Sequence, residues 1–162
     1  MTFEKLGLSS DLLKAVTDLG FETPTPIQQQ TIPLLSKELT DIVALAQTGT
    51  GKTAAFGLPI LEKINTEEKK VQALILAPTR ELCVQITNDM KNYGKYMRGF
   101  SITAVYGGSS IENQIRDIKR GVQVIAATPG RLLDLIERRA VNLNTVNIVV
   151  LDEADEMLNM GF

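Results

Sequence analysis

Residues 42–56, IVALAQTGTGKTAAF, contain the pattern that decides the fold. The first five residues form an apolar run, glycine then recurs at positions 49 and 51, and good helix formers follow from Lys52. A strand that turns through glycines into a helix is a building unit of α/β sheets. The pattern therefore predicts a strand over residues 42–46 and a helix that opens at Lys52.

Four further apolar runs resemble the first, because each is followed by a turn signal and then by helical periodicity. They span residues 73–77, 102–105, 122–126 and 148–151. The runs are continuous rather than alternating, which indicates strands covered on both faces, as in a parallel sheet between helices. We predict a doubly wound α/β fold with three α/β/α layers and a mainly parallel sheet, in which ligands bind beyond the carboxyl ends of the strands.

The first 36 residues predict helices rather than strands. Leu12, Val16 and Leu19 recur at helical spacing behind a Ser-Ser-Asp start that suits a helix N-cap. Gly20 is placed to end this helix. The prolines of FETPTPIQQQ, residues 21–30, then favour an extended segment before a second helix.

The composition limits the class of protein. The chain has 162 residues, 44% of them hydrophobic, which suits one domain with one substantial core. A net charge of -2 provides no general basic field for nucleic acid, so such a partner needs a local site. The single cysteine, Cys83, has no partner for an internal disulfide, and there is no histidine to ligate a metal. Neither a secretory signal nor a membrane-length apolar run is seen, so a cytoplasmic protein with no membrane partner is expected.

The turn after the first run has the sequence of a phosphate-binding loop. In AQTGTGKT, residues 46–53, the two glycines let the backbone curl, so that N–H groups and the helix N-terminus face phosphate oxygens. Lys52 adds a cation for the β and γ phosphates, and Thr53 adds a hydroxyl for Mg²⁺. The strict pattern has glycine where this chain has Ala46. The alternative is a glycine-rich turn that caps an ordinary helix.

Two carboxylates follow the last apolar run. Phosphate-loop enzymes orient Mg²⁺ with a carboxylate at the end of a neighbouring strand, and Asp152 stands at such an end. Glu153 comes next and can polarise the water that attacks the γ phosphate. The alternative is a pair of solvated acids at a helix start, which the helix dipole favours.

The residues Asp152-Glu153-Ala154-Asp155 spell the motif that names the DEAD-box ATP-dependent RNA helicases. The chain resembles the N-terminal RecA-like lobe of the bacterial type. Further motifs of the family occur in the expected order: GFETPTPIQ at 20–28, AQTGTGKT at 46–53, PTREL at 78–82, Gly107-Gly108, and TPGR at 128–131. The resemblance implies one RecA-like P-loop NTPase lobe over 1–162, with a Q-motif region at 1–36 and a P-loop core at 37–162. It also implies that the chain ends after motif II, so that motif III and the second RecA-like lobe are missing.

The resemblance implies ATP and Mg²⁺ as cofactors. Gln28 is expected to read adenine, which favours ATP over GTP, and Phe3 is expected to stack on the base. The alternatives are a surface amide for Gln28 and a core anchor for Phe3. The implied ATP-binding residues are Phe3, Thr23, Gln28, Ala46, Gln47, Thr48, Gly49, Thr50, Gly51, Lys52 and Thr53. The implied catalytic residues are Lys52, Asp152 and Glu153, with Thr53 and Asp152 on the metal, partly through water.

The resemblance also implies RNA as a partner, held by its sugar-phosphate backbone with little sequence specificity. The implied RNA-binding residues are Pro78, Thr79, Arg80, Gly107, Gly108, Thr128, Pro129, Gly130 and Arg131. Two of these groups follow strands and open helices, so that helix N–H groups and an arginine meet phosphates, while the glycines allow close approach. The alternative is two ordinary helix starts, each with a solvated arginine.

The function implied is that of the ATP-binding lobe of an enzyme that couples ATP binding and hydrolysis to RNA binding and local duplex unwinding. In the family the second lobe supplies arginines that stabilise the transferring phosphoryl group, so this chain alone is expected to bind nucleotide weakly and to be nearly inactive. Part of the core is expected to be uncovered, which favours self-association, although the residues define no oligomeric state. Two alternatives stay open: a P-loop ATPase that acts on DNA or protein, and a nucleotide-gated RNA-binding module without turnover.

Overall fold

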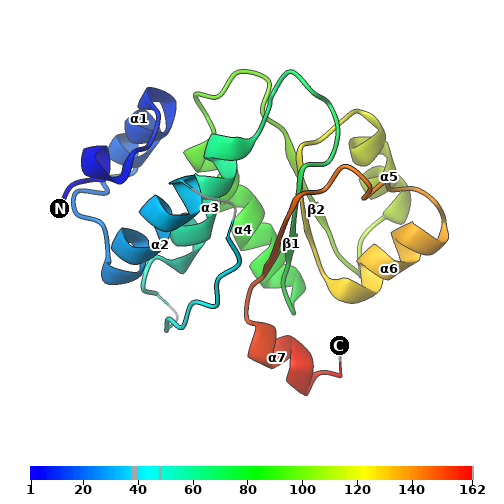
Figure 1. Cartoon of the computed structure of the whole chain (residues 1–162). Coiled ribbons are helices and arrows are strands. Elements are labelled where there is room, and N and C mark those ends of the chain that lie inside the picture. Colours follow the sequence, from blue (N-terminus) through cyan, green and yellow to red (C-terminus); the bar gives the residue numbers. More distant parts are fainter. Residues whose placement is uncertain (38–39, 48, 162) are drawn as a thin grey trace. The chain divides into compact units, whose positions relative to one another are not determined.

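The computed structural model describes residues 1–37, 40–47 and 49–161. Its elements run in the order η1, α1, α2, α3, β1, α4, β2, α5, β3, α6, β4 and α7 (Figure 1). The chain divides into two compact units. The helical unit comprises Met1–Ile64 and Asp89–Arg98, and the sheet unit comprises Asn65–Asn88 and Gly99–Phe162.

The sheet unit contains four parallel strands, which confirms the parallel sheet predicted from the continuous apolar runs. They are β1 (Ala73–Leu76), β2 (Ile102–Val105), β3 (Val124–Ala127) and β4 (Ile148–Leu151). Their spatial order is β2-β3-β1-β4. In register, Ala73 of β1 lies opposite Val124 on one side and Ile148 on the other. All four carboxyl ends therefore point to the same edge of the sheet.

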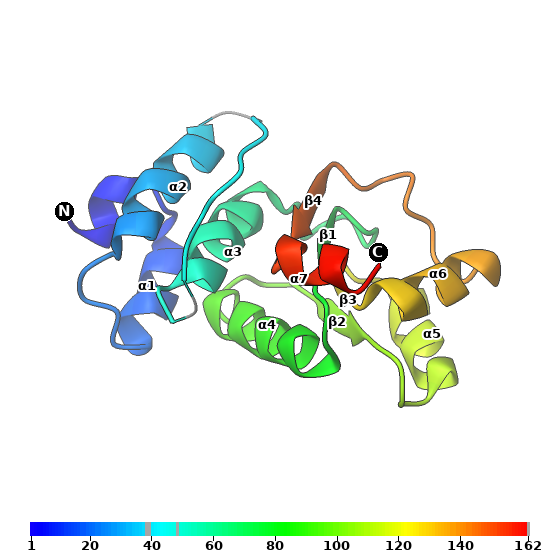
Figure 2. The same cartoon turned by 90° about the horizontal axis from the view of Figure 1, so that it is seen from below.

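Helices cover both faces of this sheet. The helices α5 (Ile111–Lys119) and α6 (Pro129–Glu137) lie on one side, and α4 (Arg80–Tyr93) lies on the other (Figure 1, Figure 2). The three layers are those predicted. A buried apolar cluster joins the strands to α6, and it consists of Val71, Leu74, Val105, Val122, Ile125, Ala127, Leu132 and Leu135. Each valine, leucine or isoleucine of the cluster contributes roughly 1.5–3 kcal/mol when its side chain leaves water, so this face holds much of the stability of the unit.

Strand β4 differs from the other three strands in its burial, and its edge position does not explain this, because β2 forms the other edge and is largely buried. Val149 and Leu151 are exposed, while Ile148 and Val150 are half-buried. This alternation is typical of a strand that packs on one face only. The prediction that every apolar run is covered on both faces is therefore wrong for β4.

The predicted strand over residues 42–46 is not formed. The described residues 40–47 contain no strand, and Val43 and Leu45 are 93% and 92% exposed. A strand needs a neighbour to pair its N–H and C=O groups, and no described strand pairs with this segment. An apolar β-type run shows a preference for strand, but it does not supply the partner.

The helical unit contains η1 (Phe3–Leu6), α1 (Ser10–Asp18), α2 (Pro26–Lys37), α3 (Lys52–Lys63) and the end of α4. Gly20 follows α1 with a φ of +78°, as predicted for the residue that ends this helix. Gly57 lets α3 approach α4 closely, because a Cβ there would lie 2.6 Å from Met90 Sδ. Among the described residues, no helix has the length and apolar character needed to cross a bilayer.

The single cysteine lies in α4, where Cys83 is fully buried and not in a disulfide. Burial raises the pKa of its thiol to about 12. The group therefore stays protonated at neutral pH and behaves as a small apolar side chain of the core.

Candidate functional site

The predicted phosphate loop leads directly into α3. Gly49 and Gly51 have φ values of +82° and +80°, which residues with a side chain rarely adopt. The hydroxyl of Thr50 donates to the carbonyl oxygen of Gln47 at 2.6 Å. Thr48 lies outside the described residues. The curled backbone predicted from the glycines is therefore present where it is described.

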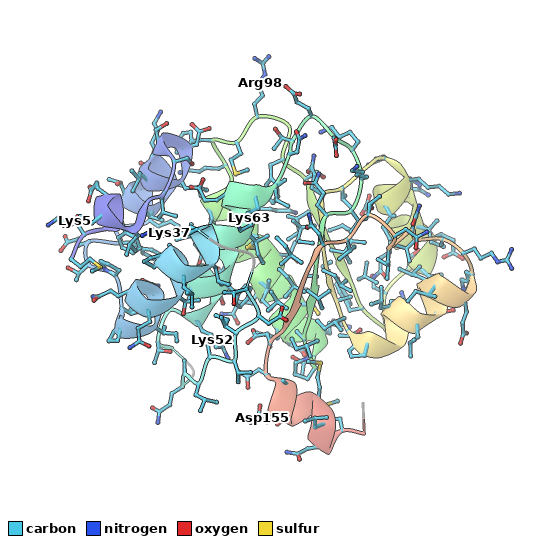
Figure 3. All side chains as sticks on the ribbon, viewed as in Figure 1. Lys5, Lys37, Lys52, Lys63, Arg98 and Asp155 are labelled. Atoms are coloured by element: carbon cyan, nitrogen blue, oxygen red, sulfur yellow. The ribbon has the colours of Figure 1, made fainter. Side chains whose placement is uncertain are left out.

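The helix that follows begins at Lys52, so its first N–H groups have no partner further back in the same helix. Such groups, together with the positive end of the helix dipole, favour an anion. Thr53 stands one residue into the helix and is half-buried. Figure 3 shows Lys52 and Lys63 at the two ends of α3.

Gln28 of α2 is bonded to the backbone beside this loop. Its side chain is 3% exposed. Its Oε1 accepts from the N–H of Thr25 at 3.0 Å, and its Nε2 donates to the carbonyl oxygen of Gly51 at 3.1 Å. The carbonyl of Gly51 also accepts from the N–H of Ala55 at 3.1 Å. The amide predicted to read adenine thus has contacts to protein on both of its ends.

Phe3 and Thr23 are the two other residues predicted to lie near the base. Phe3 is buried, and its ring stacks on that of Phe21 with centroids 6.2 Å apart and planes inclined by 29°. This packing corresponds to the core anchor that the sequence left open as an alternative. Thr23 is exposed. Contact of Phe3 or Thr23 with adenine stays a prediction.

The two carboxylates lie at the end of β4 in the sheet unit. Asp152 is buried, and its N–H donates to the carbonyl oxygen of Leu76 at 2.9 Å, which continues the ladder between β1 and β4. Glu153 has a φ of +54° and precedes α7 (Ala154–Asn159). A left-handed backbone at a residue other than glycine costs roughly 1–2 kcal/mol, and such strain often marks functional positions. Among the described residues, Arg139 has a similar φ of +55°, and Glu153 is the one of the two that is predicted to polarise water.

The predicted RNA-binding residues follow three adjacent strands, β1, β2 and β3. Arg80 lies over the ring of Tyr106, with its Cζ 5.7 Å from the ring centroid. Gly108 has a φ of +80°, and a Cβ there would lie 3.2 Å from Nη1 of Arg80. The structure therefore brings the residues after β1 into contact with those after β2.

A second set of contacts joins the loop after β2 to α6. Nη1 of Arg131 donates to the carbonyl oxygen of Ser109 at 3.1 Å and to Oε1 of Gln114 at 2.9 Å. Nε2 of Gln114 donates to the carbonyl oxygen of Tyr106 at 3.0 Å. Arg80 and Arg131, which lie 51 positions apart in the chain, thus belong to one connected group of side chains and loops.

The other predicted RNA-binding residues have simpler settings. Pro78 is buried, and the hydroxyl of Thr79 accepts from the N–H of Leu82 at 3.2 Å, which caps α4. Thr128 precedes α6 without a side-chain capping bond. Pro129, Gly130 and Gly107 lie in these same helix starts and loops, and no side-chain contact would hinder a Cβ at either glycine.

Sequence reasoning missed Gln114 and Tyr106. Gln114 stands within the apolar stripe of α5 formed by Ile111, Ile115 and Ile118. A polar residue at such a position is buried, so it needs hydrogen-bond partners, and this was the available signal. Tyr106 directly precedes the glycine pair, but its sequence position alone indicates no contact with Arg80.

Comparison with known proteins places these features in a family. The family model described as DEAD/DEAH box helicase matches residues 25–162. The chain therefore belongs to the DEAD/DEAH box helicase family.

Individual relatives agree with this assignment. Over its whole length, the chain is 56% identical to the DEAD-box ATP-dependent RNA helicase CshA of Streptococcus pneumoniae, of which it covers 30%. It is also 52% identical to the ATP-dependent RNA helicase DeaD of Haemophilus influenzae, of which it covers 26%. The chain thus spans less than a third of the length of these relatives.

Solved structures support the same fold. A DEAD box protein from the hyperthermophile Methanococcus jannaschii matches 99% of this chain and 44% of its own, with a TM-score of 0.94 and 44% identity. S. cerevisiae Dbp5 bound to RNA and ADP BeF3 matches 98% of this chain and 39% of its own, with a TM-score of 0.88 and 39% identity. The fold is the RecA-like fold of these proteins, as predicted.

Proposed function

We propose that this chain is the ATP-binding lobe of an ATP-dependent RNA helicase, with residues 1–162 forming one RecA-like lobe. The proposal rests on two features that occur together in a chain of the DEAD/DEAH box helicase family: a phosphate-binding loop and a carboxylate after a strand. The glycine-rich loop opens α3 at Lys52, and the buried Asp152 follows a strand of the parallel sheet. This is the combination that phosphate-loop enzymes use for nucleotide and metal.

In this proposal the residues of the loop before α3 hold the phosphates of ATP. The N–H groups of the loop and of the first helical turn meet phosphate oxygens, and Lys52 neutralises charge on the β and γ phosphates. Thr53 and Asp152 would hold Mg²⁺, partly through water, and oxygen donors of this kind suit that hard cation. When bound, the metal would neutralise charge that develops on the transferring phosphoryl group. Glu153 would accept a proton from the attacking water.

The RNA strand is proposed to lie along the loops after β1, β2 and β3. Arg80 and Arg131 supply cations there, and the glycines of the loop after β2 leave room for a sugar-phosphate chain. The relative Dbp5 has been solved with RNA and ADP BeF3, which supports RNA as a partner of this chain. Because backbone phosphates carry no sequence information, binding with little sequence preference is expected.

The isolated chain is proposed to bind nucleotide weakly and to hydrolyse it slowly. The relatives CshA of Streptococcus pneumoniae and DeaD of Haemophilus influenzae are more than three times as long, and their remaining length is proposed to include the second lobe, which supplies further charge to the transition state. Duplex unwinding is therefore assigned to the longer protein and not to this chain alone.

The loop can be tested by titrating a fluorescent ATP analogue into Lys52→Ala and a control, Lys63→Ala. Both lysines belong to α3, but only Lys52 adjoins the loop. We expect Lys52→Ala to lose affinity on the order of 100-fold, since charge-assisted contacts to phosphate are lost, and Lys63→Ala to bind normally. Unchanged affinity of Lys52→Ala would disprove the assignment of this loop.

The role of Glu153 can be tested separately from binding. Glu153→Gln keeps the shape of the side chain but removes its ability to take a proton, so nucleotide affinity should stay within about twofold while single-turnover hydrolysis falls by roughly 100-fold or more. Glu156→Gln, an exposed acid of α7, is the matched control. Equal hydrolysis rates in Glu153→Gln and the unchanged chain would assign proton transfer to another group.

The choice of RNA over DNA can be tested by filter binding of single strands of each, with an ATP analogue, across a range of salt. Both should show salt dependence from phosphate contacts, but RNA should bind more tightly because its 2′-OH adds contacts that DNA lacks. Equal affinity for the two would favour an ATPase that acts on DNA or on nucleic acid in general.

A further inference from the structure

Gln114 connects functional loops that are distant in sequence. It lies in α5, on the apolar side of that helix, and its side chain is only 5% exposed. Its Oε1 accepts from Arg131 and its Nε2 donates to the carbonyl oxygen of Tyr106. A buried amide with partners on both ends is held in one orientation, and so are the groups that it contacts.

We propose that Gln114 is a positioning residue for RNA binding, which acts by fixing the direction of the Arg131 guanidinium. This inference rests on the proposed function, in which Arg131 meets a backbone phosphate. Gln114 itself is too buried to meet RNA, so its effect must pass through the groups that it holds.

The hydrogen bonds of Arg131 explain how this works. Both of its bonds use Nη1, one to Ser109 and one to Gln114. A guanidinium carries five N–H donors, two of them on Nη1, so Nε and Nη2 hold the other three. Within the described part of the chain, Nε and Nη2 have no acceptor. The edge formed by these two nitrogens can bind a phosphate through two parallel hydrogen bonds.

The Nε2 end of the Gln114 amide also holds the loop after β2 in place. By donating to the carbonyl of Tyr106, it fixes the backbone of the residue whose ring lies under Arg80. Arg80 and Arg131 are therefore both oriented with reference to one buried amide. An arginine that is already oriented loses less conformational freedom when it binds RNA.

The test is a double-mutant cycle on RNA affinity, with Gln114→Ala, Arg131→Ala and the double variant. Anisotropy of a labelled single-stranded RNA is measured at several salt concentrations, and the thermal midpoint of each variant is recorded. Asn113→Ala is the matched control, because Asn113 is the exposed neighbour on the same helix.

We expect Gln114→Ala to weaken binding about tenfold, the size of effect expected for losing a hydrogen bond to a charged group, while Asn113→Ala has no effect. In the Arg131→Ala background, Gln114→Ala should weaken binding no more than about twofold, because its direct partner is already gone and only its indirect effect on Arg80, through Tyr106, remains. A role in folding alone would instead give the same factor in both backgrounds, and that result would overturn the proposal.

Gln114→Glu provides a second variant in case the alanine variant fails to fold. Its carboxylate still accepts from Arg131, but it competes with phosphate for the charge and has no N–H for Tyr106. We expect weaker RNA binding. The slope of log affinity against log salt concentration should fall by about the amount that one phosphate contact contributes. An unchanged affinity and salt slope would overturn the proposal.

The outcomes separate this inference from the proposed function. If the unchanged chain binds no RNA, or if Arg131→Ala binds as well as the unchanged chain, RNA contact by Arg131 is wrong and the positioning role falls with it. If Arg131→Ala weakens binding while Gln114→Ala does not, the proposed function stands and only the positioning role is overturned.

Discussion

The loop before α3 and the loop after β2 are each held by one buried glutamine, but the two glutamines hold different kinds of group. Gln28 contacts backbone on both ends, at Thr25 and Gly51. Gln114 contacts backbone on one end and the charged side chain of Arg131 on the other. The first therefore fixes the path of a loop, whereas the second fixes the direction of a charge. Changes at Gln28 should alter loop shape and stability together, and changes at Gln114 should alter ligand affinity more than stability.

Gln28 is also proposed to recognise adenine, and its observed hydrogen bonds leave room for this role. An amide has two N–H donors and a carbonyl oxygen with two lone pairs, and the observed bonds use one of each. One donor and one lone pair are left, which matches the donor and acceptor that adenine presents. Holding the loop and reading the base are therefore chemically compatible, provided that the base reaches an amide that is nearly buried.

The largest loss of stability is expected from Gly51→Ala. A Cβ at this position would lie 2.3 Å from Nε2 of Gln28, and the φ of +80° disfavours any side chain. The clash and the backbone strain together should cost about 3 kcal/mol of unfolding free energy and reduce nucleotide affinity at least tenfold. Thermal unfolding and titration with an ATP analogue measure the two effects.

Gly49→Ala is the control for this prediction. Gly49 has nearly the same φ, +82°, but a Cβ there would meet nothing within 4 Å. It should cost only the strain of the left-handed backbone, roughly 1–2 kcal/mol. If the two variants are equally destabilised, the contact between Gln28 and Gly51 does not shape the loop.

A smaller effect is expected from Gln28→Glu. Its carboxylate still accepts from Thr25, but it cannot donate to Gly51, so the two oxygens repel one another and about 1–3 kcal/mol of stability should be lost. If Gln28 also reads adenine, affinity for ATP should fall more than affinity for GTP. Titration with both nucleotides measures the ratio, and Gln30→Glu, an exposed neighbour in α2, is the control.

An equal loss for ATP and GTP would limit Gln28 to holding the loop. A selective loss of affinity for ATP with unchanged stability would show that Gln28 reads the base and does not hold the loop. The two results therefore decide whether Gln28 fixes the shape of the loop or recognises the base, while Gln114 orients a charged side chain.

The features that sequence predicted are those determined over short stretches of chain. The glycines before Lys52, the helix that opens there and the strands that precede Arg80 and Asp152 each depend on adjacent residues, and all are present. The strand over residues 42–46 failed because pairing depends on a neighbouring strand, which composition does not reveal. Gln114 escaped notice for a similar reason. Its partners, Tyr106 and Arg131, are brought together only by the folded sheet.

The smallest difference in stability is expected between variants of Thr79 and Thr128, which stand in similar sequence motifs. Both precede a helix after a strand, but the hydroxyl of Thr79 caps α4, while that of Thr128 makes no capping bond to α6. Thr79→Ala should therefore lower the unfolding free energy by about 1 kcal/mol, and Thr128→Ala should leave it within about 0.5 kcal/mol. Denaturant unfolding of both variants measures the difference. If Thr128 binds RNA as proposed, its variant should lose RNA affinity at unchanged stability, which would place its hydroxyl with Arg131 as a ligand group. A stability loss of the same size in both variants would show that the two threonines serve their helices alike, because only a cap removed from each helix gives matched destabilisation.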